Sequence, residues 1–207
     1  MKVHLREGGE GSGNFRHKGR KGQVGGSSKD DYQDLEYSDF PKKKFKAKEI
    51  EAFSMWTGMW FPCFGDYLRY DKISGGLYNQ EELDEAIGII DNSINQTFKE
   101  NIYLYRGVHS KWNLKVGDTF TDKNFVATSA SKHWANLFTD SEEATIFRIH
   151  VKAGTKFTVT PHSGEQEIIL ARNTKFRVIG FSKIPLYAKE YFPKVETISV
   201  VDVEIYE

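Results

Sequence analysis

The spacing of hydrophobic residues changes near Glu100. Before this point, apolar residues recur at helical spacing over residues 47–69 and 81–98. After it, short runs rich in β-branched and aromatic residues alternate with turns, which predicts strands at 102–108, 118–128, 144–151, 155–160, 166–171, 174–181 and 197–206. Helices that come first and strands that follow indicate an α+β fold, because a parallel α/β sheet would need the two to alternate.

Both helical regions present an apolar face. In the first, Phe53, Trp56, Trp60 and Phe64 fall near one side, and Pro62 must kink or break the run, so we expect one broken helix or two short ones. The second region is amphipathic, with acidic residues in its first turn. Its apolar stripe consists of Leu83, Ala86, Ile87, Ile90, Ile94 and Phe98.

Residues 1–40 have a different composition from the rest of the chain. Their first thirty residues are rich in Gly, Ser, Lys and Arg, which predicts a flexible tail ahead of a folded domain at 41–207. The glycine-rich stretch 11–27 resembles a segment of bacteriophage head proteins, and a plain linker explains it equally well. Under the alternative of a nucleic-acid-binding protein, the basic residues of this tail would supply salt-sensitive contact with phosphates; they are Lys2, Arg6, Arg16, Lys18, Arg20, Lys21 and Lys29.

The overall charge and the single cysteine limit the class of protein. The chain has 29 basic and 29 acidic residues, so no global field draws it to nucleic acid or to anionic lipid. It contains no apolar run of membrane-spanning length and no secretory signal, so we expect a cytosolic protein without a membrane partner. Cys63 is the only cysteine, which excludes an internal disulfide and fits a reducing compartment.

Three short motifs in the second half carry polar groups at the ends of predicted strands. Arg106 offers a rigid fork of donors suited to a pyrophosphate or a carboxylate, and Gly107 beside it permits close approach of a ligand. Thr128 and Ser129 can orient a carboxylate or a ribose. The third motif holds Glu165 and Glu167, whose side chains project to the same side of an extended chain. Together these groups predict a site for glycosidic chemistry on an anionic ligand.

The same motifs identify a family. From about Ala47 to its end the chain resembles the mono-ADP-ribosyltransferases of the arginine, serine-threonine-serine, glutamate class, which include bacterial binary toxins and phage-encoded enzymes. The resemblance rests on Trp56-Thr57-Gly58, Tyr67-Leu68-Arg69, Leu104-Tyr105-Arg106-Gly107, Phe125-Val126-Ala127-Thr128-Ser129 and Glu165-Gln166-Glu167. Ala127 stands where the family has the first serine of its hydroxyl triplet.

The resemblance implies two packed, mainly antiparallel sheets around a cleft that binds NAD as a substrate, with no metal. It assigns catalysis to Glu167 with Ser129, and selection of the acceptor to Glu165. The implied NAD contacts are Arg106 at the phosphates, Gly107 and Phe138 near the nicotinamide, Thr128 and Ser129 bracing the cleft, and Trp56 and Arg69 on the helices.

The activity implied is transfer of ADP-ribose from NAD to arginine side chains of bacterial host proteins. Glu165 favours arginine, because a glutamine there would suit a neutral amide acceptor. Three alternatives stay open: a virion or nucleic-acid-binding protein with an inert transferase-like domain, an NAD glycohydrolase, and an enzyme that modifies a nucleic acid base. The expected location is the host cytoplasm, reached either by expression there or by packaging in a phage head, which the tail could contact.

Overall fold

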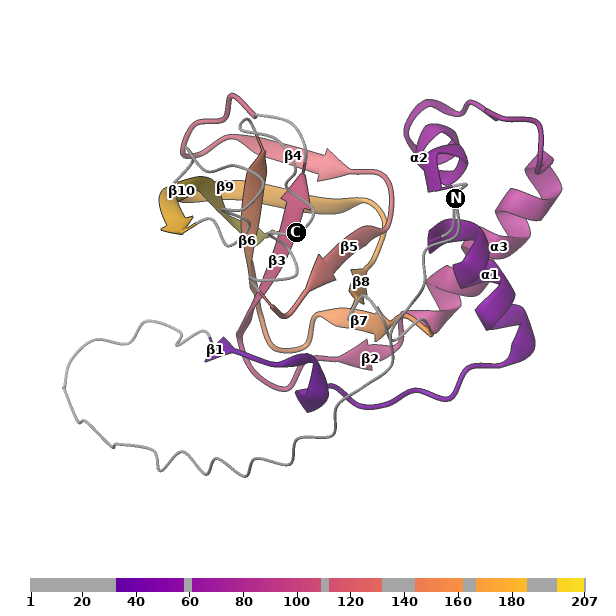
Figure 1. The fold of residues 1–207 in the computed structure, drawn as a ribbon, viewed down its shortest axis with the longest axis horizontal. Helices are drawn as coiled ribbons and strands as arrows, with labels where there is room; N and C mark the ends of the chain where they lie inside the picture. Colours follow the sequence, from indigo (N-terminus) through magenta and orange to yellow (C-terminus); the bar gives the residue numbers. More distant parts are fainter. Residues whose placement is uncertain are drawn as a thin grey trace, which may run out of the picture.

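The computed structural model describes residues 33–57, 61–108, 112–131, 144–161, 167–185 and 197–206. Three helices precede most of the strands in the chain, which confirms the α+β class (Figure 1). The helices are α1 (Ala47–Thr57), α2 (Phe61–Tyr70) and α3 (Gln80–Ser93), after a short strand β1 (Gln33–Asp34) and a 3-10 turn η1 (Tyr37–Asp39). The remaining strands are β2 (Gln96–Thr97), β3 (Ile102–Val108), β4 (Thr119–Asp122), β5 (Val126–Ser129), β6 (Thr145–Val151), β7 (Lys156–Val159), β8 (Glu167–Leu170), β9 (Thr174–Pro185) and β10 (Thr197–Ile205).

The helical regions form as two short helices and one longer one. Pro62 is the second residue of α2, where its missing N–H leaves no helical hydrogen bond unmade. A capping box starts α3, because the Asn79 side chain accepts a bond from the Glu82 amide at 3.0 Å and the Glu82 carboxylate accepts one from the Asn79 amide at 2.8 Å. No helix within the described ranges has the length and hydrophobicity to cross a bilayer.

The helix α3 ends at Ser93, so the expectation that it continues to residue 98 is wrong. The Phe98 amide donates to the Thr155 carbonyl at 3.1 Å, and the Phe98 ring stacks on Phe157 with 4.1 Å between ring centroids. These contacts with the β7 region place Phe98 in the core of the sheet instead of on the helix.

The described strands form one hydrogen-bonded sheet that consists of two halves. One half has the order β2-β7-β8-β5, the other β3-β6-β10-β9-β4, and β1 adds to the edge of β3. Only the pairs β1–β3 and β6–β10 are parallel among the nine described pairings, so the sheet is mainly antiparallel as expected. A single residue pair, Tyr105 with Ser129, joins β3 to β5 and hence the two halves.

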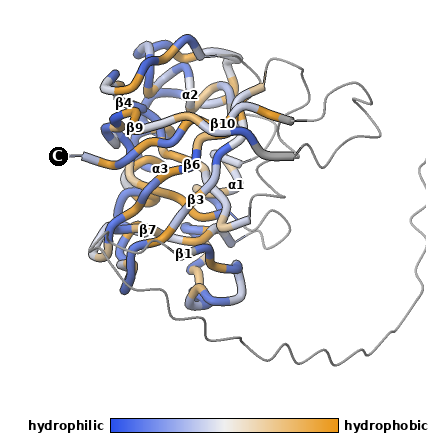
Figure 2. The backbone as a smooth tube through the Cα atoms, turned by 90° about the vertical axis from the view of Figure 1, so that its left-hand side faces the viewer, coloured by the Kyte–Doolittle hydropathy of each residue, from blue (hydrophilic) through white to orange (hydrophobic). Residues whose placement is uncertain are grey.

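Two hydrophobic cores cover the faces of the sheet near β5 and β8. Val126 and Ile168 point into the core between the sheet halves, whereas Ala127 and Ile169 point toward the helices. These two strands are therefore apolar on both faces, and Figure 2 shows hydrophobic stretches interspersed with hydrophilic ones along the backbone. The core beneath the helices is built mainly from Phe53, Trp56, Phe64, Leu83, Ile90 and Phe125.

Residues 33–40 contact the sheet at two places. Strand β1 pairs with β3, and Phe40 is only 7% exposed, with its ring edge-on to Phe98 and Phe157 at 6.0 and 5.6 Å. The predicted domain boundary after residue 40 stays a prediction, and the described structure places residues 33–40 against the sheet. The low hydrophobicity of the first thirty residues gave no indication that Phe40, at the end of this segment, packs into the core.

Candidate active site

A cavity opens where the two halves of the sheet separate. Beyond the Tyr105–Ser129 pair, β3 and β5 diverge, and a space of about 620 Å³ lies between β3, β4 and the end of α2. We call it the Arg106 cavity. Its lining combines apolar side chains with charged and aromatic ones. The charged residues and two of the aromatic ones are Arg69, Tyr70, Arg106, Trp112, Asp122 and Lys123.

One carboxylate holds two guanidinium groups at the rim of the Arg106 cavity. Arg106 Nη1 lies 3.0 Å from Asp122 Oδ2, and Arg69 Nη2 lies 3.3 Å from Asp122 Oδ1. Burial lowers the pKa of Arg106, and the carboxylates of Asp122 and Glu167 oppose that effect. With Lys123, the lining carries three basic groups and one acid, a net charge of +2. The cavity is therefore suited to an anion with about two negative charges.

The hydroxyl motif and the second acidic residue lie in one row across the sheet. Tyr105 pairs with Ser129, and Ser129 pairs with Glu167, so these three side chains share a face. The Thr128 hydroxyl donates to the Ile168 carbonyl at 2.6 Å and so fastens β5 to β8. Ser129 Oγ accepts a bond from the Ser131 amide at 3.1 Å, which fixes its orientation beside Glu167.

Arg106 and Glu167 come from distant segments and lie within electrostatic range of each other. The Glu167 carboxylate acts to raise the pKa of Arg106, against the larger effect of burial. Burial raises the pKa of Tyr37, and Glu167 adds a smaller effect in the same direction. Arg106 follows Tyr105, so it projects to the opposite face from the Tyr105–Glu167 row, into the cavity. No described residue of β8 lines that cavity. A ligand that touches both groups must lie across the open end between β3 and β5.

The remaining expected site residues lie in several different surroundings. Arg69 lines the Arg106 cavity, and Gly107 lies within β3 opposite Ile146. Trp56 is 1% exposed and contacts Phe125 edge-on in the core beneath the helices, and its expected role as an NAD contact stays a prediction. The aromatic spacing that suggested a ligand contact is the spacing of a buried helix face. Glu165 and Phe138 lie outside the described residues.

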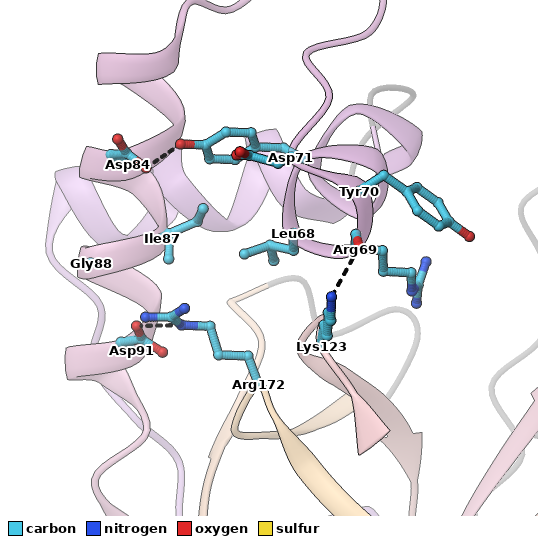
Figure 3. A pocket seen from close by; sticks show the side chains of 11 residues that line it. Leu68, Arg69, Tyr70, Asp71, Asp84, Ile87, Gly88, Asp91, Lys123 and Arg172 are labelled. Atoms are coloured by element: carbon cyan, nitrogen blue, oxygen red, sulfur yellow. Dashed lines mark hydrogen bonds and ion pairs between the residues drawn. The ribbon is translucent and has the colours of Figure 1, made fainter. Parts of the chain in front are cut away.

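A second cavity, of about 550 Å³, lies between α2 and α3 and is called the α2–α3 cavity here (Figure 3). Two polar contacts cross its lining: the Tyr67 hydroxyl donates to Asp84 at 2.7 Å, and Arg172 Nε donates to Asp91 at 2.8 Å. Lys123 Nζ reaches the Arg69 carbonyl at 3.4 Å. Arg69, Tyr70 and Lys123 line both cavities. The end of α2 is thus the wall between them, and it positions Arg69.

The sequence pattern did not reveal Asp122 or Tyr37. Residues 118–128 read as one strand, whereas the structure breaks them at Asp122, whose Oδ1 accepts a bond from the Asn124 amide at 3.0 Å. A carboxylate that caps a turn is common. β4 is the last strand of its half of the sheet and is separated from β3 by β6, β10 and β9. The curvature of this half brings Asp122 of β4 back to Arg106 of β3.

Replacing Asp122 with asparagine should lower stability and loosen both arginines. Asp122 and Arg106 are 14% and 19% exposed, so Arg106 would keep a largely buried charge without its counterion. We expect a loss of about 1.5–3 kcal/mol in the free energy of unfolding, the range for a hydrogen bond to a charged group. Urea denaturation with an unchanged m-value would measure it. A loss below about 0.5 kcal/mol would contradict the bridging role.

Residues 36–200 match the ADP-ribosyltransferase exoenzyme family, and the chain belongs to that family. No curated protein sequence matches the chain. Several solved ADP-ribosyltransferase structures share the fold. BECa, an ADP-ribosylating toxin of a binary enterotoxin of C. perfringens solved with NADH, is 15% identical with a TM-score of 0.60, over 78% of this chain and 44% of its own.

Two further structures show the same likeness. The enzymatic component C2-I of the C2-toxin from Clostridium botulinum is 20% identical over 82% of this chain and 45% of its own, with a TM-score of 0.59. Vis toxin from Vibrio splendidus is 20% identical over 78% of this chain and 74% of its own, with a TM-score of 0.55. The chain thus spans less than half the length of BECa and C2-I, and at these identities the likeness extends to the fold.

Proposed function

We propose that this protein transfers a single ADP-ribose unit from NAD to arginine side chains of bacterial host proteins and releases nicotinamide. The observation that carries the proposal is the pair of guanidinium groups of Arg69 and Arg106 at the rim of one cavity, within electrostatic range of Glu167. Membership of the ADP-ribosyltransferase exoenzyme family supports it.

The Arg106 cavity has the charge and the surfaces that a dinucleotide requires. Its net charge of +2 matches the two negative charges of a pyrophosphate, and each guanidinium can donate paired hydrogen bonds to phosphate oxygens. Tyr70 and Trp112 stand at the same rim, where flat rings can stack on a base. Arg106 would hold the pyrophosphate and so orient the nicotinamide ribose.

Glu167 would stabilise the sugar as the glycosidic bond breaks. The leaving nicotinamide is neutral, so the reaction needs no general acid, unlike glycoside hydrolysis by paired carboxyl groups. The Glu167 carboxylate would accept a hydrogen bond from the ribose 2′-OH and place its negative charge beside the developing oxocarbenium ion. Ser129, fixed opposite Glu167 in the ladder, would orient that carboxylate.

The arginine acceptor requires a second carboxylate. A guanidinium has a pKa above about 12 and is a poor nucleophile while it is protonated. Glu165, two residues before Glu167, would orient the incoming guanidinium and take its proton during attack.

Glu165→Gln should therefore separate transfer from hydrolysis. We expect transfer to arginine to fall by about 10²–10⁴-fold, the usual contribution of a general base, while NAD hydrolysis persists because water needs no such selection. Nicotinamide release and labelled acceptor are measured in the same reaction. An equal loss of both activities in Glu165→Gln would refute this division of roles.

The test of the proposed function uses labelled NAD and a bacterial extract, followed by mass spectrometry of the labelled peptides. The expected product is ADP-ribose on arginine, absent when Glu167→Gln replaces the native protein. Nicotinamide release without a labelled protein would instead favour an NAD glycohydrolase. If neither occurs and deletion of residues 1–30 abolishes DNA binding, the protein is a nucleic-acid-binding protein with an inert domain.

A further inference from the structure

Two of the described glycines lie inside helices, where glycine is a less stable choice than alanine. Gly65 is a buried residue in the middle of α2, and Gly88 lies in the middle of α3. Neither has a positive φ, so the backbone does not require glycine at either position. Glycine within a helix lowers the folding equilibrium constant about two- to fivefold relative to alanine. A reason for glycine can therefore lie only in the surroundings of each position.

The space around these two glycines differs. A β-carbon at position 65 would lie 3.1 Å from Arg69 Nη1 and 3.7 Å from Asn124 Nδ2. The first of these distances is shorter than the roughly 3.5 Å of a favourable contact between non-bonded heavy atoms, so the guanidinium would have to move. A β-carbon at position 88 would have no described heavy atom within 4 Å. Gly65 is thus in close contact with a side chain of the candidate site, and Gly88 is not.

The Arg69 side chain folds back along its own helix. Residues four apart lie on the same face of a helix, so Arg69 stands one turn after Gly65. Its side chain extends from the side of α2 that faces away from α3 (Figure 3), and its Nη2 atom lies 3.3 Å from Asp122 Oδ1. The guanidinium therefore lies between the bare backbone of Gly65 and the Asp122 carboxylate.

Arg69 has little freedom to move away from position 65. The 3.3 Å distance between Arg69 Nη2 and Asp122 Oδ1 is already at the long end of N–H···O hydrogen bonds, which span about 2.7–3.2 Å. Asp122 is held in place, because its Oδ1 atom also accepts from the Asn124 amide at 3.0 Å and its Oδ2 atom pairs with Arg106 at 3.0 Å. A displacement of Arg69 by a few tenths of an ångström would therefore weaken or break its contact with Asp122.

We propose that Gly65 is a positioning residue that holds Arg69 at the rim of the Arg106 cavity. Because position 65 has no side chain, the Arg69 guanidinium can lie against α2, reach Asp122 and stay directed at the pyrophosphate. The inference rests on the proposed function, in which Arg69 and Arg106 bind that group. Gly65 acts through Arg69 and takes no part in the chemistry.

Gly65→Ala should weaken NAD binding without slowing the chemical step. Arg69 would bind the pyrophosphate in the ground state and the transition state alike, so a displaced guanidinium should raise KM and leave kcat nearly unchanged. We expect KM for NAD to rise about 3- to 10-fold, less than for complete loss of a hydrogen bond to a charged group.

A double-mutant cycle tests this role, with Gly88→Ala as the matched control. Both glycine variants are made in the native chain and in an Arg69→Ala chain. Nicotinamide release gives KM for NAD, and urea denaturation gives the folding equilibrium constant. With Arg69 present, Gly65→Ala should raise KM and bring little gain in stability, because the new methyl group meets the guanidinium. Without Arg69, it should leave KM unchanged and raise the folding equilibrium constant about two- to fivefold, as Gly88→Ala should in both chains.

Three results would overturn the inference. They are an unchanged KM in Gly65→Ala with Arg69 present, an equal rise in KM with and without Arg69, and an equal gain in stability in both chains. If Gly65→Ala alone fails to fold, a folded double variant with Arg69→Ala supports the inference and an unfolded one overturns it. Absence of nicotinamide release from the native chain removes the proposed function instead, and the folding equilibria then still decide whether Gly65 places Arg69.

Discussion

Glu167→Gln is expected to lower both ADP-ribose transfer and NAD hydrolysis by about 10²–10³-fold, the cost of removing one preorganised electrostatic contact to a transition state. The substitution keeps the size of the side chain and removes its charge. Glu167 is the first residue of β8 and is half-buried, so the ladder with Ser129 can persist. Nicotinamide release under single-turnover conditions measures the chemical step separately from product release.

Glu85→Gln is the matched control for this variant. Glu85 is 61% exposed on α3 and pairs with Lys48 at the surface, so its replacement should leave activity unchanged. A Glu167→Gln protein that folds normally and releases nicotinamide at the native rate would remove Glu167 from catalysis, and with it the proposed mechanism.

Arg106→Lys has the second largest expected effect, a fall of about 10- to 100-fold in kcat/KM for NAD. Lysine keeps the positive charge beside Asp122 but loses the fork of donors, and hydrogen bonds to charged groups contribute about 1.5–3 kcal/mol each. The loss should appear mainly in KM, because Arg106 holds the pyrophosphate in both ground and transition states. Trp112 lines the same cavity, so quenching of its fluorescence reports NAD binding.

Arg172→Lys provides the comparison, since Arg172 lines the α2–α3 cavity and pairs with Asp91 at 2.8 Å. NAD kinetics should be unaffected in this variant. If Arg172→Lys raises KM for NAD as much as Arg106→Lys does, the dinucleotide occupies the α2–α3 cavity instead, and the assignment of the Arg106 cavity is wrong.

Local patterns in the sequence predicted most of the secondary structure. The period of apolar residues located α1, α2 and α3, and alternation located six of the strands to within a few residues. The errors arose where contacts between distant residues decide the outcome. Phe98 continues the helical stripe in the sequence, but stacking on Phe157 places it in the sheet core. Phe40 follows a polar segment, but two aromatic contacts bury it.

The candidate site was predictable only as far as local motifs mark its residues. Ser129 ends β5, Glu167 begins β8 and Arg106 lies near the end of β3, so the order of their motifs made them candidates. Asp122 has no such context, and its importance depends on the curl that returns β4 to β3. Trp56 lies in the core beneath the helices, and an aromatic at helical spacing marks a core position as readily as a ligand contact.

In the proposed mechanism, Arg106 and Glu167 act on one NAD molecule at the junction of β3 and β5. A crystal structure of the Glu167→Gln variant with NAD tests it most directly, because slow chemistry preserves the intact dinucleotide. The pyrophosphate is expected within hydrogen-bond distance of Arg106 and Arg69, with the nicotinamide ribose 2′-OH beside residue 167. NAD bound with its pyrophosphate away from Arg106, or with its nicotinamide ribose remote from residue 167, would contradict the claim.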